Sequence, residues 1–295
     1  MSSLDSYQRR FLKLLSLFSL TRSYNILVLV VAQYLTARYI LAPETTWFNL
    51  LFDLRFFCLV MASALITAAG YIINNFYDAA KDQINRPKKY VLEHLISQNA
   101  QLVFYLLLNL FAIVFASAFS FYAVLFFLGY MISIWMYSLI IKRLFWLSNL
   151  FSAFLMILPF WAITLYIKNF EPIVFYHASY LFFLLLARDI VKDLENFKGD
   201  WVLRYKTLPV VFDHNLTKAI VCMVLLICFI PIYFLMQHDL GIMHYYFLIS
   251  IPILFAVSIF LLMAKDQKMY LWTHNVLKFW ILIGVLSIAL IYKHF

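Results

Sequence analysis

Long apolar runs separated by short polar segments dominate the pattern of this chain. A membrane-spanning helix needs about 20 mainly apolar residues, and nine segments meet that requirement. They lie near residues 24–41, 54–73, 100–119, 121–141, 148–167, 173–190, 218–236, 244–263 and 275–292. The pattern therefore predicts an all-α polytopic membrane protein, a bundle of nine transmembrane helices.

The segment before the first apolar run, residues 1–23, has a basic start and a short apolar core. It resembles a signal peptide, but Arg22, Ser23 and Tyr24 stand where a small-residue cleavage site would be needed. We expect instead an interfacial helix on the inner leaflet that leads into the first span. The whole chain, residues 1–295, is then predicted to be one transmembrane domain.

Composition supports this class, because 65% of the residues are hydrophobic, 13% are charged and the mean hydropathy is +0.89. These values exclude a soluble domain. Lys and Arg also set the orientation: with a cytoplasmic N-terminus, the outer segments keep only Arg38, Arg55, Lys168 and Lys293 of the 23 basic residues. We therefore expect the chain in the inner cell membrane. The formal charge of +9 then belongs to the cytoplasmic face, where it suits anionic lipids and phosphorylated substrates rather than nucleic acid.

Several kinds of functional site are disfavoured by the residues present. The three Cys lie in apolar runs without paired spacing, and the seven His are scattered singly without a zinc-binding pattern. The five Gly form no nucleotide-binding loop. Phosphate groups would therefore have to be bound by a metal ion and by basic side chains.

Acidic residues are concentrated in two stretches, residues 74–82 and 188–200, each at the end of an apolar run. Six of the fourteen Asp and Glu residues fall there: Asp78, Asp82, Asp189, Asp193, Glu195 and Asp200. The second and sixth spans run in the same direction through the membrane, so both stretches are expected at the cytoplasmic face. This placement predicts one active-site cavity that opens to the cytoplasm.

The spacing within each stretch is helical. Asn74, Asp78 and Asp82 are four residues apart, which places them on one side of a continuing helix. Asp189 and Asp193 repeat the spacing, and Asp200 shares their face if the helix persists past Gly199, although Gly199 could also end it. Magnesium takes one or two carboxylates and completes its shell with water and phosphate oxygens. Two opposed carboxylate sets therefore fit a diphosphate held between two Mg²⁺ ions.

Basic residues close to these stretches could neutralise a leaving diphosphate. They are Arg86, Lys88 and Lys89 after the first stretch, Lys142 and Arg143 in an intervening loop, and Arg188 and Lys192 within the second. An alternative interpretation is that the acids merely pair with neighbouring bases on solvated helix ends. Two such sets on parallel helices favour the functional interpretation.

The same motifs resemble those of the UbiA superfamily of intramembrane prenyltransferases over nearly the whole chain. The family's first motif, NDxxDxxxD followed by N-R-P, is matched by Asn74 to Asp82 and by Asn85-Arg86-Pro87. Residues 188–200, followed by Lys206-Thr207-Leu208-Pro209, are similar to the branch that makes archaeal-type ether lipids. Two common acidic positions are replaced here, by Asn75 and Asn196. Shorter similarities cover Arg22 and Asn25 before the first span, and Tyr137 before Lys142 and Arg143.

The resemblance implies a magnesium-dependent enzyme that transfers a prenyl group, geranylgeranyl in this branch, from its allylic diphosphate to a membrane-embedded acceptor. The implied catalytic metal ligands are Asp78, Asp82, Asp189 and Asp193, with Asn74 as a further ligand. The implied substrate-binding residues are Arg22, Asn25, Asn74, Arg86, Tyr137, Lys142, Arg143, Lys192 and Asp200.

Two alternatives to prenyl transfer onto a glycerol phosphate remain open: a different acceptor and a different function. The acceptor could be aromatic, such as a quinone precursor, a chlorophyllide or haem, because the motifs are shared. The protein could also transport a phosphorylated lipid or anion. Transporters bind at the membrane midplane on broken helices, whereas the acids here lie at one face and only Pro159, Pro231 and Pro252 interrupt the spans.

Overall fold

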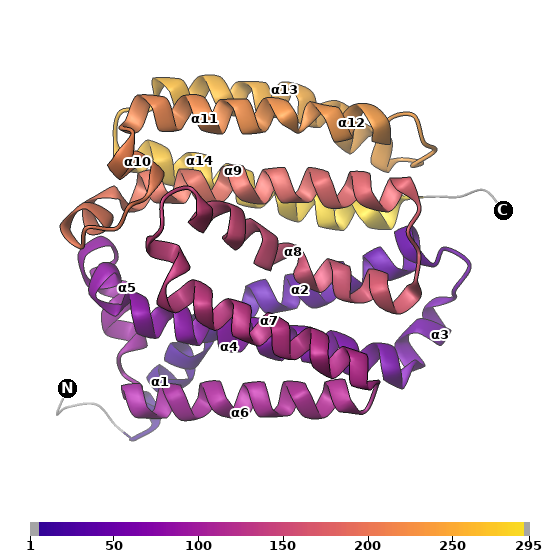
Figure 1. Ribbon diagram of the computed structural model, residues 1–295, viewed down its shortest axis with the longest axis horizontal. Coiled ribbons are helices and arrows are strands. Elements are labelled where there is room, and N and C mark those ends of the chain that lie inside the picture. The colour runs from indigo at the N-terminus through magenta and orange to yellow at the C-terminus, as the bar shows by residue number, and fades with distance from the viewer. Residues whose placement is uncertain (1–5, 292–295) are drawn as a thin grey trace. The chain divides into compact units, whose positions relative to one another are not determined.

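The computed structural model describes residues 6–291, and the side chains of residues 11–291. Every regular element in this part of the chain is helical (Figure 1). Nine helical segments are long and apolar enough to span a membrane: Ser23–Leu41, Leu54–Asn85, Gln98–Ser117, Phe121–Arg143, Leu147–Ile167, Pro172–Val202, His214–Leu235, Met243–Met263 and Gln267–Leu290. Each corresponds to one predicted span, which confirms the all-α polytopic fold. Residues 1–5 of the predicted interfacial segment, and residue 292 of the last predicted span, lie outside the described residues.

Contacts between residues divide the chain into two compact units. Unit 1 consists of Met1–Val30 and Cys58–Leu139, and unit 2 of Val31–Phe57 and Ile140–Phe295, in each case as far as the chain is described. The boundaries at Val30 and Phe57 fall inside two helices, α2 (Ser23–Thr36) and α4 (Leu54–Asn85), so both helices contribute to both units. The prediction of a single domain stays a prediction.

Unit 1 is built around α4, together with α1 (Ser6–Thr21), α5 (Pro87–Glu93), α6 (Gln98–Ser117) and α7 (Phe121–Leu139). A tight turn connects α6 to α7, and the two helices pack side by side (Figure 1). Small residues let helices approach closely in a membrane, and a Cβ added at Gly70 of α4 would meet Ile134 of α7 at 3.1 Å. A cluster of Leu20, Ala68, Ala69, Ile72 and Leu108 forms a core in this unit.

Helix α1 is amphipathic and contacts α5. Phe11, Leu14 and Phe18 are exposed, whereas Ser16 and Leu20 are buried. The helix ends at Thr21, and Arg22 adopts a positive φ of 48° before α2 begins at Ser23. The exposed apolar face is what an interfacial helix needs, and the position of this helix at a membrane surface stays a prediction.

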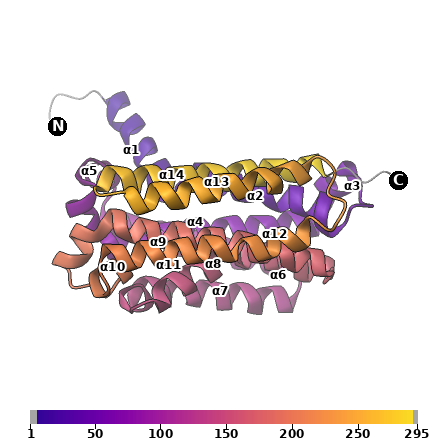
Figure 2. The ribbon, with the colours of Figure 1, turned by 90° about the horizontal axis from the view of Figure 1, so that it is seen from above.

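Helix α9 (Pro172–Val202) is central to unit 2. It contacts α8 (Leu147–Ile167), α10 (Leu208–Val211), α11 (His214–Ile227), α12 (Phe229–Leu235) and α14 (Gln267–Ser287), while α13 (Met243–Met263) packs on α11 and α14 (Figure 2). The seventh span is interrupted at Cys228 between α11 and α12. Pro231 explains this interruption, because a proline lacks the N–H that would bond the carbonyl of Ile227 and its ring crowds that carbonyl.

Four short elements complete the described chain: η1 (Ala37–Leu41), α3 (Trp47–Phe52), η2 (Ile141–Arg143) and η3 (Ile288–Leu290). Gln33 of α2 donates from Nε2 to the carbonyl of Pro159, 2.9 Å away, and so joins α2 to α8. Tyr166 donates from its hydroxyl to Asp53, 2.6 Å away, and so links the end of α8 to the start of α4.

Both acidic stretches are helical, and both long helices extend past the apolar spans predicted from the sequence. Helix α4 continues to Asn85 and α9 continues through Gly199 and Asp200 to Val202. The open question at Gly199 is thereby settled in favour of the continuing helix. Helix α4 ends before Arg86, whose φ of −142° and ψ of 60° are non-helical because the next residue is Pro87.

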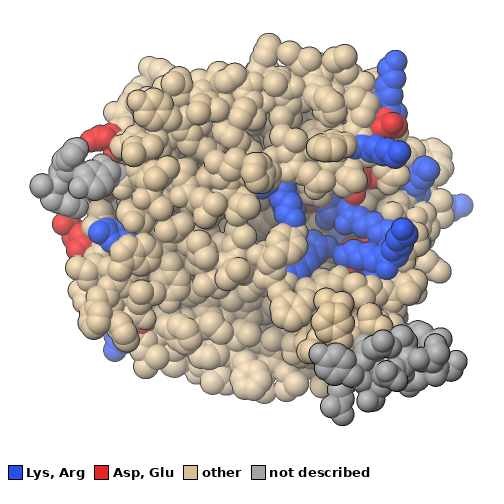
Figure 3. Space-filling view, turned by 180° about the vertical axis from the view of Figure 1, so that it is seen from behind, with Lys and Arg blue, Asp and Glu red and all other residues tan. Residues whose placement is uncertain are grey.

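The surface is mostly uncharged, and the Lys and Arg side chains in view gather in a few groups (Figure 3). Large apolar side chains such as Leu106, Leu110 and Phe111 of α6 are exposed. A water-soluble protein rarely exposes so much apolar area, whereas lipid tails solvate it. The chain is therefore an integral, multi-pass membrane protein.

Candidate functional site

The first acidic set lies on the continuous helix α4, where Asn74, Asp78 and Asp82 occupy positions one turn apart. All three side chains are half-buried. Asn75 follows about 100° further round the helix and is buried instead, where its amide donates to the carboxylate of Glu93. The two asparagines of this motif therefore occupy different environments.

Two predicted substrate-binding residues, Arg22 and Asn25, meet α4 just before this set. Asn25 donates from Nδ2 to the hydroxyl of Tyr71 at 3.4 Å, and the Arg22 guanidinium lies over the Tyr71 ring, 4.8 Å from its centroid. Cation–aromatic contacts of this kind hold a guanidinium in place without neutralising it. Unit 1 thus gathers Arg22, Asn25 and Tyr71 close to Asn74.

Arg86 and Tyr137 are the remaining predicted site residues of unit 1. Arg86 is half-buried between α4 and α5, and its backbone N–H donates to the carbonyl of Asp82 at 2.8 Å. Tyr137 is half-buried near the end of α7, next to the buried Ser138.

The second acidic set, in unit 2, is organised by a residue that the sequence did not indicate. Asn149, in the first turn of α8 and 2% exposed, donates from Nδ2 to Asp193 at 2.8 Å and to Asp189 at 3.3 Å. One amide therefore bridges both predicted ligand carboxylates. A single Asn at the start of an apolar run carries no motif, and the only signal was its polar character inside a span.

The rest of residues 188–200 is held mainly by contacts within unit 2. Asp200 is fully buried and accepts from the Thr207 hydroxyl at 3.4 Å, which ties the end of α9 to the segment that follows it. Glu195 accepts from Nδ1 of His274 at 2.8 Å and so links α9 to α14. This histidine also lies outside any sequence motif. Asn196 is buried, and Lys192 is half-buried.

The predicted basic residues Lys142 and Arg143 form part of η2. Lys142 is buried, whereas Arg143 is exposed and its guanidinium lies 5.3 Å from the centre of the Tyr205 ring. The carbonyl of Arg143 accepts from the backbone N–H of Lys206 at 3.3 Å. Unit 2 therefore brings the loop before α8 next to the segment after α9.

The donor chemistry of these sets fits magnesium. Asp189 and Asp193 approach a single amide, and Oδ1 of the same Asn149 is buried without a hydrogen-bond partner in the described structure. Within residues 11–291, no three His, Cys, Asp or Glu side chains gather into one metal-binding group. Carboxylate and amide oxygens are ligands that magnesium takes in proteins, and water and phosphate oxygens complete its shell.

Comparison with known proteins gives the family. The model of the UbiA prenyltransferase family matches residues 30–282. The digeranylgeranylglyceryl phosphate synthase of Saccharolobus solfataricus is 29% identical over 192 residues, which cover 64% of this chain and 68% of that protein. The synthase of the same name from Korarchaeum cryptofilum is 27% identical over 263 residues, 85% of this chain and 91% of the relative.

Solved structures show the same fold. A structure described as giving insights into digeranylgeranylglyceryl phosphate synthase in membranes has a TM-score of 0.70 and 18% identity, and the match covers 95% of this chain and 98% of that one. A UbiA homologue from Archaeoglobus fulgidus bound to GPP and Mg²⁺ has a TM-score of 0.64 and 15% identity, over 93% and 99% of the two chains. Since the family model spans most of the sequence, this chain belongs to the UbiA prenyltransferase family.

Proposed function

We propose that this protein is a magnesium-dependent enzyme that transfers a geranylgeranyl group from its diphosphate to a prenylated glycerol phosphate. The observation that carries the site is the pairing of Asp189 and Asp193 on one buried amide of Asn149. The similarity to several digeranylgeranylglyceryl phosphate synthases supports the choice of donor and acceptor.

In this proposal, Asn74, Asp78 and Asp82 on α4, and Asp189 and Asp193 on α9, would supply ligands for two Mg²⁺ ions that bind the diphosphate. When bound, these ions neutralise the charge that develops on the diphosphate as the allylic carbon–oxygen bond breaks. Basic side chains bind the remaining phosphate oxygens: Arg22, Arg86, Lys142, Arg143 and Lys192. Asn25, Tyr137 and Asp200 are proposed to shape the substrate site around them.

The prenyl group leaves as an allylic cation while the diphosphate keeps the electrons of the broken bond. The acceptor hydroxyl then forms the new ether bond and gives its proton to the released diphosphate, which is a base. Water would capture the cation, so the apolar helices must exclude it. Aromatic ring faces can stabilise such a cation by about 1 to 2 kcal/mol each when desolvated. Tyr71, Tyr77 and Tyr137 are the candidates, because each lies near the cytoplasmic end of a predicted span.

The distribution of Lys and Arg supports a location in the inner cell membrane, with the N-terminus and the active site on the cytoplasmic side. Soluble prenyl diphosphate would then reach the site from the cytoplasm, and the lipid acceptor from the bilayer. Membership of a prenyltransferase family removes the support for a transporter. An aromatic acceptor remains the second candidate, because the description of the matched family names no acceptor.

The test is transfer of label from radiolabelled geranylgeranyl diphosphate by purified protein. The acceptor panel contains geranylgeranylglyceryl phosphate, 4-hydroxybenzoate and a naphthoate, each with magnesium or with EDTA. We expect magnesium-dependent label in the glycerol phosphate product only. Label in an aromatic product would show that the acceptor is aromatic and not a glycerol phosphate. Equal transfer in EDTA would show that the reaction does not depend on the proposed metal site. Asp239→Asn, an exposed carboxylate in the loop before α13, serves as the control variant.

A further inference from the structure

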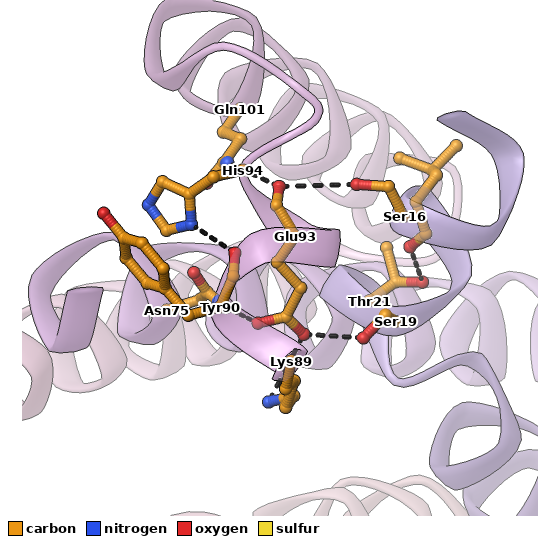
Figure 4. A network of polar contacts seen from close by, with 10 residues as sticks. Ser16, Ser19, Thr21, Asn75, Lys89, Tyr90, Glu93, His94 and Gln101 are labelled. Carbon is orange, nitrogen blue, oxygen red and sulfur yellow. Dashed lines mark hydrogen bonds and ion pairs between the residues drawn. The ribbon is translucent and has the colours of Figure 1, made fainter. Parts of the chain in front are cut away.

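Glu93, the last residue of α5, is a buried carboxylate outside the acidic motifs (Figure 4). It is 1% exposed. Its Oε1 accepts from the Ser19 hydroxyl of α1 at 2.7 Å, and its Oε2 accepts from the Asn75 amide of α4. A buried charge is costly unless it is paired and hydrogen-bonded, so these donors and the adjacent Lys89 are what allow a carboxylate here.

The same residue joins four helices of unit 1. The backbone carbonyl of Glu93 accepts from the Ser16 hydroxyl of α1 at 3.3 Å and from Nε2 of Gln101 of α6 at 3.2 Å. Together with Asn75 of α4, these contacts fix the C-terminal end of α5. The short helix that carries Lys88 and Lys89 is therefore held by contacts with three other helices, α1, α4 and α6 (Figure 4).

This arrangement gives a reason for asparagine at position 75, where the resemblance to the family leads one to expect aspartate. The Asn75 amide supplies an N–H donor to Glu93, and an aspartate has no such donor when ionised. It would instead place a second carboxylate against the first in a buried position, where like charges repel strongly. Asparagine at position 75 therefore pairs with Glu93 and helps to hold α5, and this contact explains the departure from the family motif.

Lys89 is the basic residue that Glu93 orients. Its Nζ lies 3.3 Å from Oε1 of Glu93, one helical turn away, and the side chain is 27% exposed. Burial and the nearby positive charge of Arg22 lower the pKa of Lys89, while Glu93 and Asp82 act in the opposite direction. Ser19 of α1 and Lys89 both contact Oε1 of Glu93, and the backbone N–H of Arg22 donates to the carbonyl of Ser19 at 3.2 Å. Arg22 therefore lies one turn after the residue of α1 that meets the Glu93–Lys89 pair. Two cations held near each other create a place that favours an anion.

We propose that Glu93, fixed by Asn75 and Ser19, is a positioning residue that holds Lys89 beside Arg22 so that the two cations bind the diphosphate of the prenyl donor. This inference rests on the proposed function, since it names residues that serve its donor. It assigns Lys89 a direct contact with phosphate and gives Asn75 and Glu93 an indirect role.

The binding test uses the full-length protein in detergent with magnesium pyrophosphate as the probe, without any acceptor. Lys89→Met and Glu93→Gln should each weaken pyrophosphate binding about tenfold, the worth of one charge-assisted contact. Lys89→Arg should stay within about threefold of the wild type, because the charge is kept. Lys265→Met, which removes an exposed charge between α13 and α14, should change nothing. Unchanged pyrophosphate binding in Lys89→Met would overturn the role of Lys89.

A matched pair of variants tests the coupling of position 75 to Glu93. Asn75→Asp alone should lower the melting temperature and raise KM for geranylgeranyl diphosphate more than it lowers kcat. Adding Glu93→Gln restores one carboxylate and one amide, so the melting temperature should recover, while KM stays no better than in Glu93→Gln alone, because the glutamine cannot pair with Lys89. Equal, additive losses in the double variant would overturn the coupling. If Asn75→Asp keeps the melting temperature and works at lower magnesium concentrations, position 75 is instead a place for a metal ligand.

The proposed reaction and the positioning role of Glu93 can fail separately. If the wild type transfers no prenyl group but pyrophosphate binding still depends on Lys89 and Glu93, the proposed reaction is wrong and the positioning role stands. If transfer to the glycerol phosphate proceeds and the Lys89 variants bind pyrophosphate normally, the reaction stands and the positioning role is wrong.

Discussion

At the scale of single residues, the positions that follow helical spacing could be predicted and those that depend on distant contacts could not. Asn74, Asp78 and Asp82 lie one turn apart because α4 continues through them. Asn149 lies 40 residues from Asp189, and Glu195 lies 79 residues from His274. No local pattern encodes such pairs, because they arise only when separate helices pack together.

Replacement of Asn149 tests its bridging role. Asn149→Leu keeps the approximate volume but removes the donor shared by Asp189 and Asp193. Each hydrogen bond to a charged group contributes about 1.5 to 3 kcal/mol, so we expect kcat/KM to fall at least tenfold. Transfer assays and thermal melting of the metal-free protein would measure the two effects. Wild-type kcat/KM in this variant would show that the amide does not organise the carboxylates.

The predicted metal ligands can be tested one from each helix. Asp78→Asn and Asp193→Asn keep the shape of each side chain but remove a negative charge. We expect each to reduce turnover by at least about 100-fold, as when electrostatic stabilisation of a transition state is removed. Both should remain folded, because neither side chain lies in the packed core: each is half-buried. Near-normal turnover in both variants would remove these residues from the site, and Asp239→Asn controls for loss of charge.

At the scale of helices, hydropathy located all nine spans but not the full lengths of the helices that carry the site. The apolar runs end near residues 73 and 190, whereas α4 and α9 end at Asn85 and Val202. Residues such as Lys, Gln and Glu favour helix without being apolar, so the helices persist beyond the apolar zone. This extension is what gives Asp82 and Asp200 their places on the two helices.

Close packing of α13 on α14 predicts the effect of a small change. A Cβ at Gly284 would lie 2.5 Å from the hydroxyl of Tyr246, which already donates to the carbonyl of Trp280. Gly284→Ala should therefore destabilise the protein by about 1 to 3 kcal/mol, the usual cost of overpacking. Gly129→Ala is the matched control, because nothing lies within 4 Å of its added Cβ. Melting curves in detergent compare the two, and equal stabilities would contradict the tight contact.

At the scale of the whole molecule, length and composition sufficed to predict a polytopic helical membrane protein. The apolar surface of the described chain agrees with that class, and membership of the UbiA family agrees with the chemistry expected from the two acidic stretches. The acceptor could not be predicted to the same degree, because acceptor recognition depends on the shape of a site and not on the metal-binding motif. Orientation in the membrane rests on the distribution of Lys and Arg alone.

That orientation predicts which loops face the cytoplasm. Lys168 follows α8 and Lys265 follows α13, and both side chains are exposed. In a background where Cys58, Cys222 and Cys228 are replaced by Ala, we expect a membrane-impermeant maleimide to label Lys168→Cys on intact cells. Lys265→Cys should react only after the membrane is opened, because its loop lies on the inner side.

The unsubstituted background controls for labelling elsewhere, and transfer activity confirms that each variant is correctly inserted. The reverse pattern, with Lys265→Cys labelled on intact cells, would place the N-terminus outside. The acidic ends of α4 and α9 would then face away from the cytoplasm, and a prenyl diphosphate made in the cytoplasm could not reach them. Labelling of both positions on intact cells would contradict an arrangement in which an odd number of spans, those of α9, α11–α12 and α13, separates the two loops.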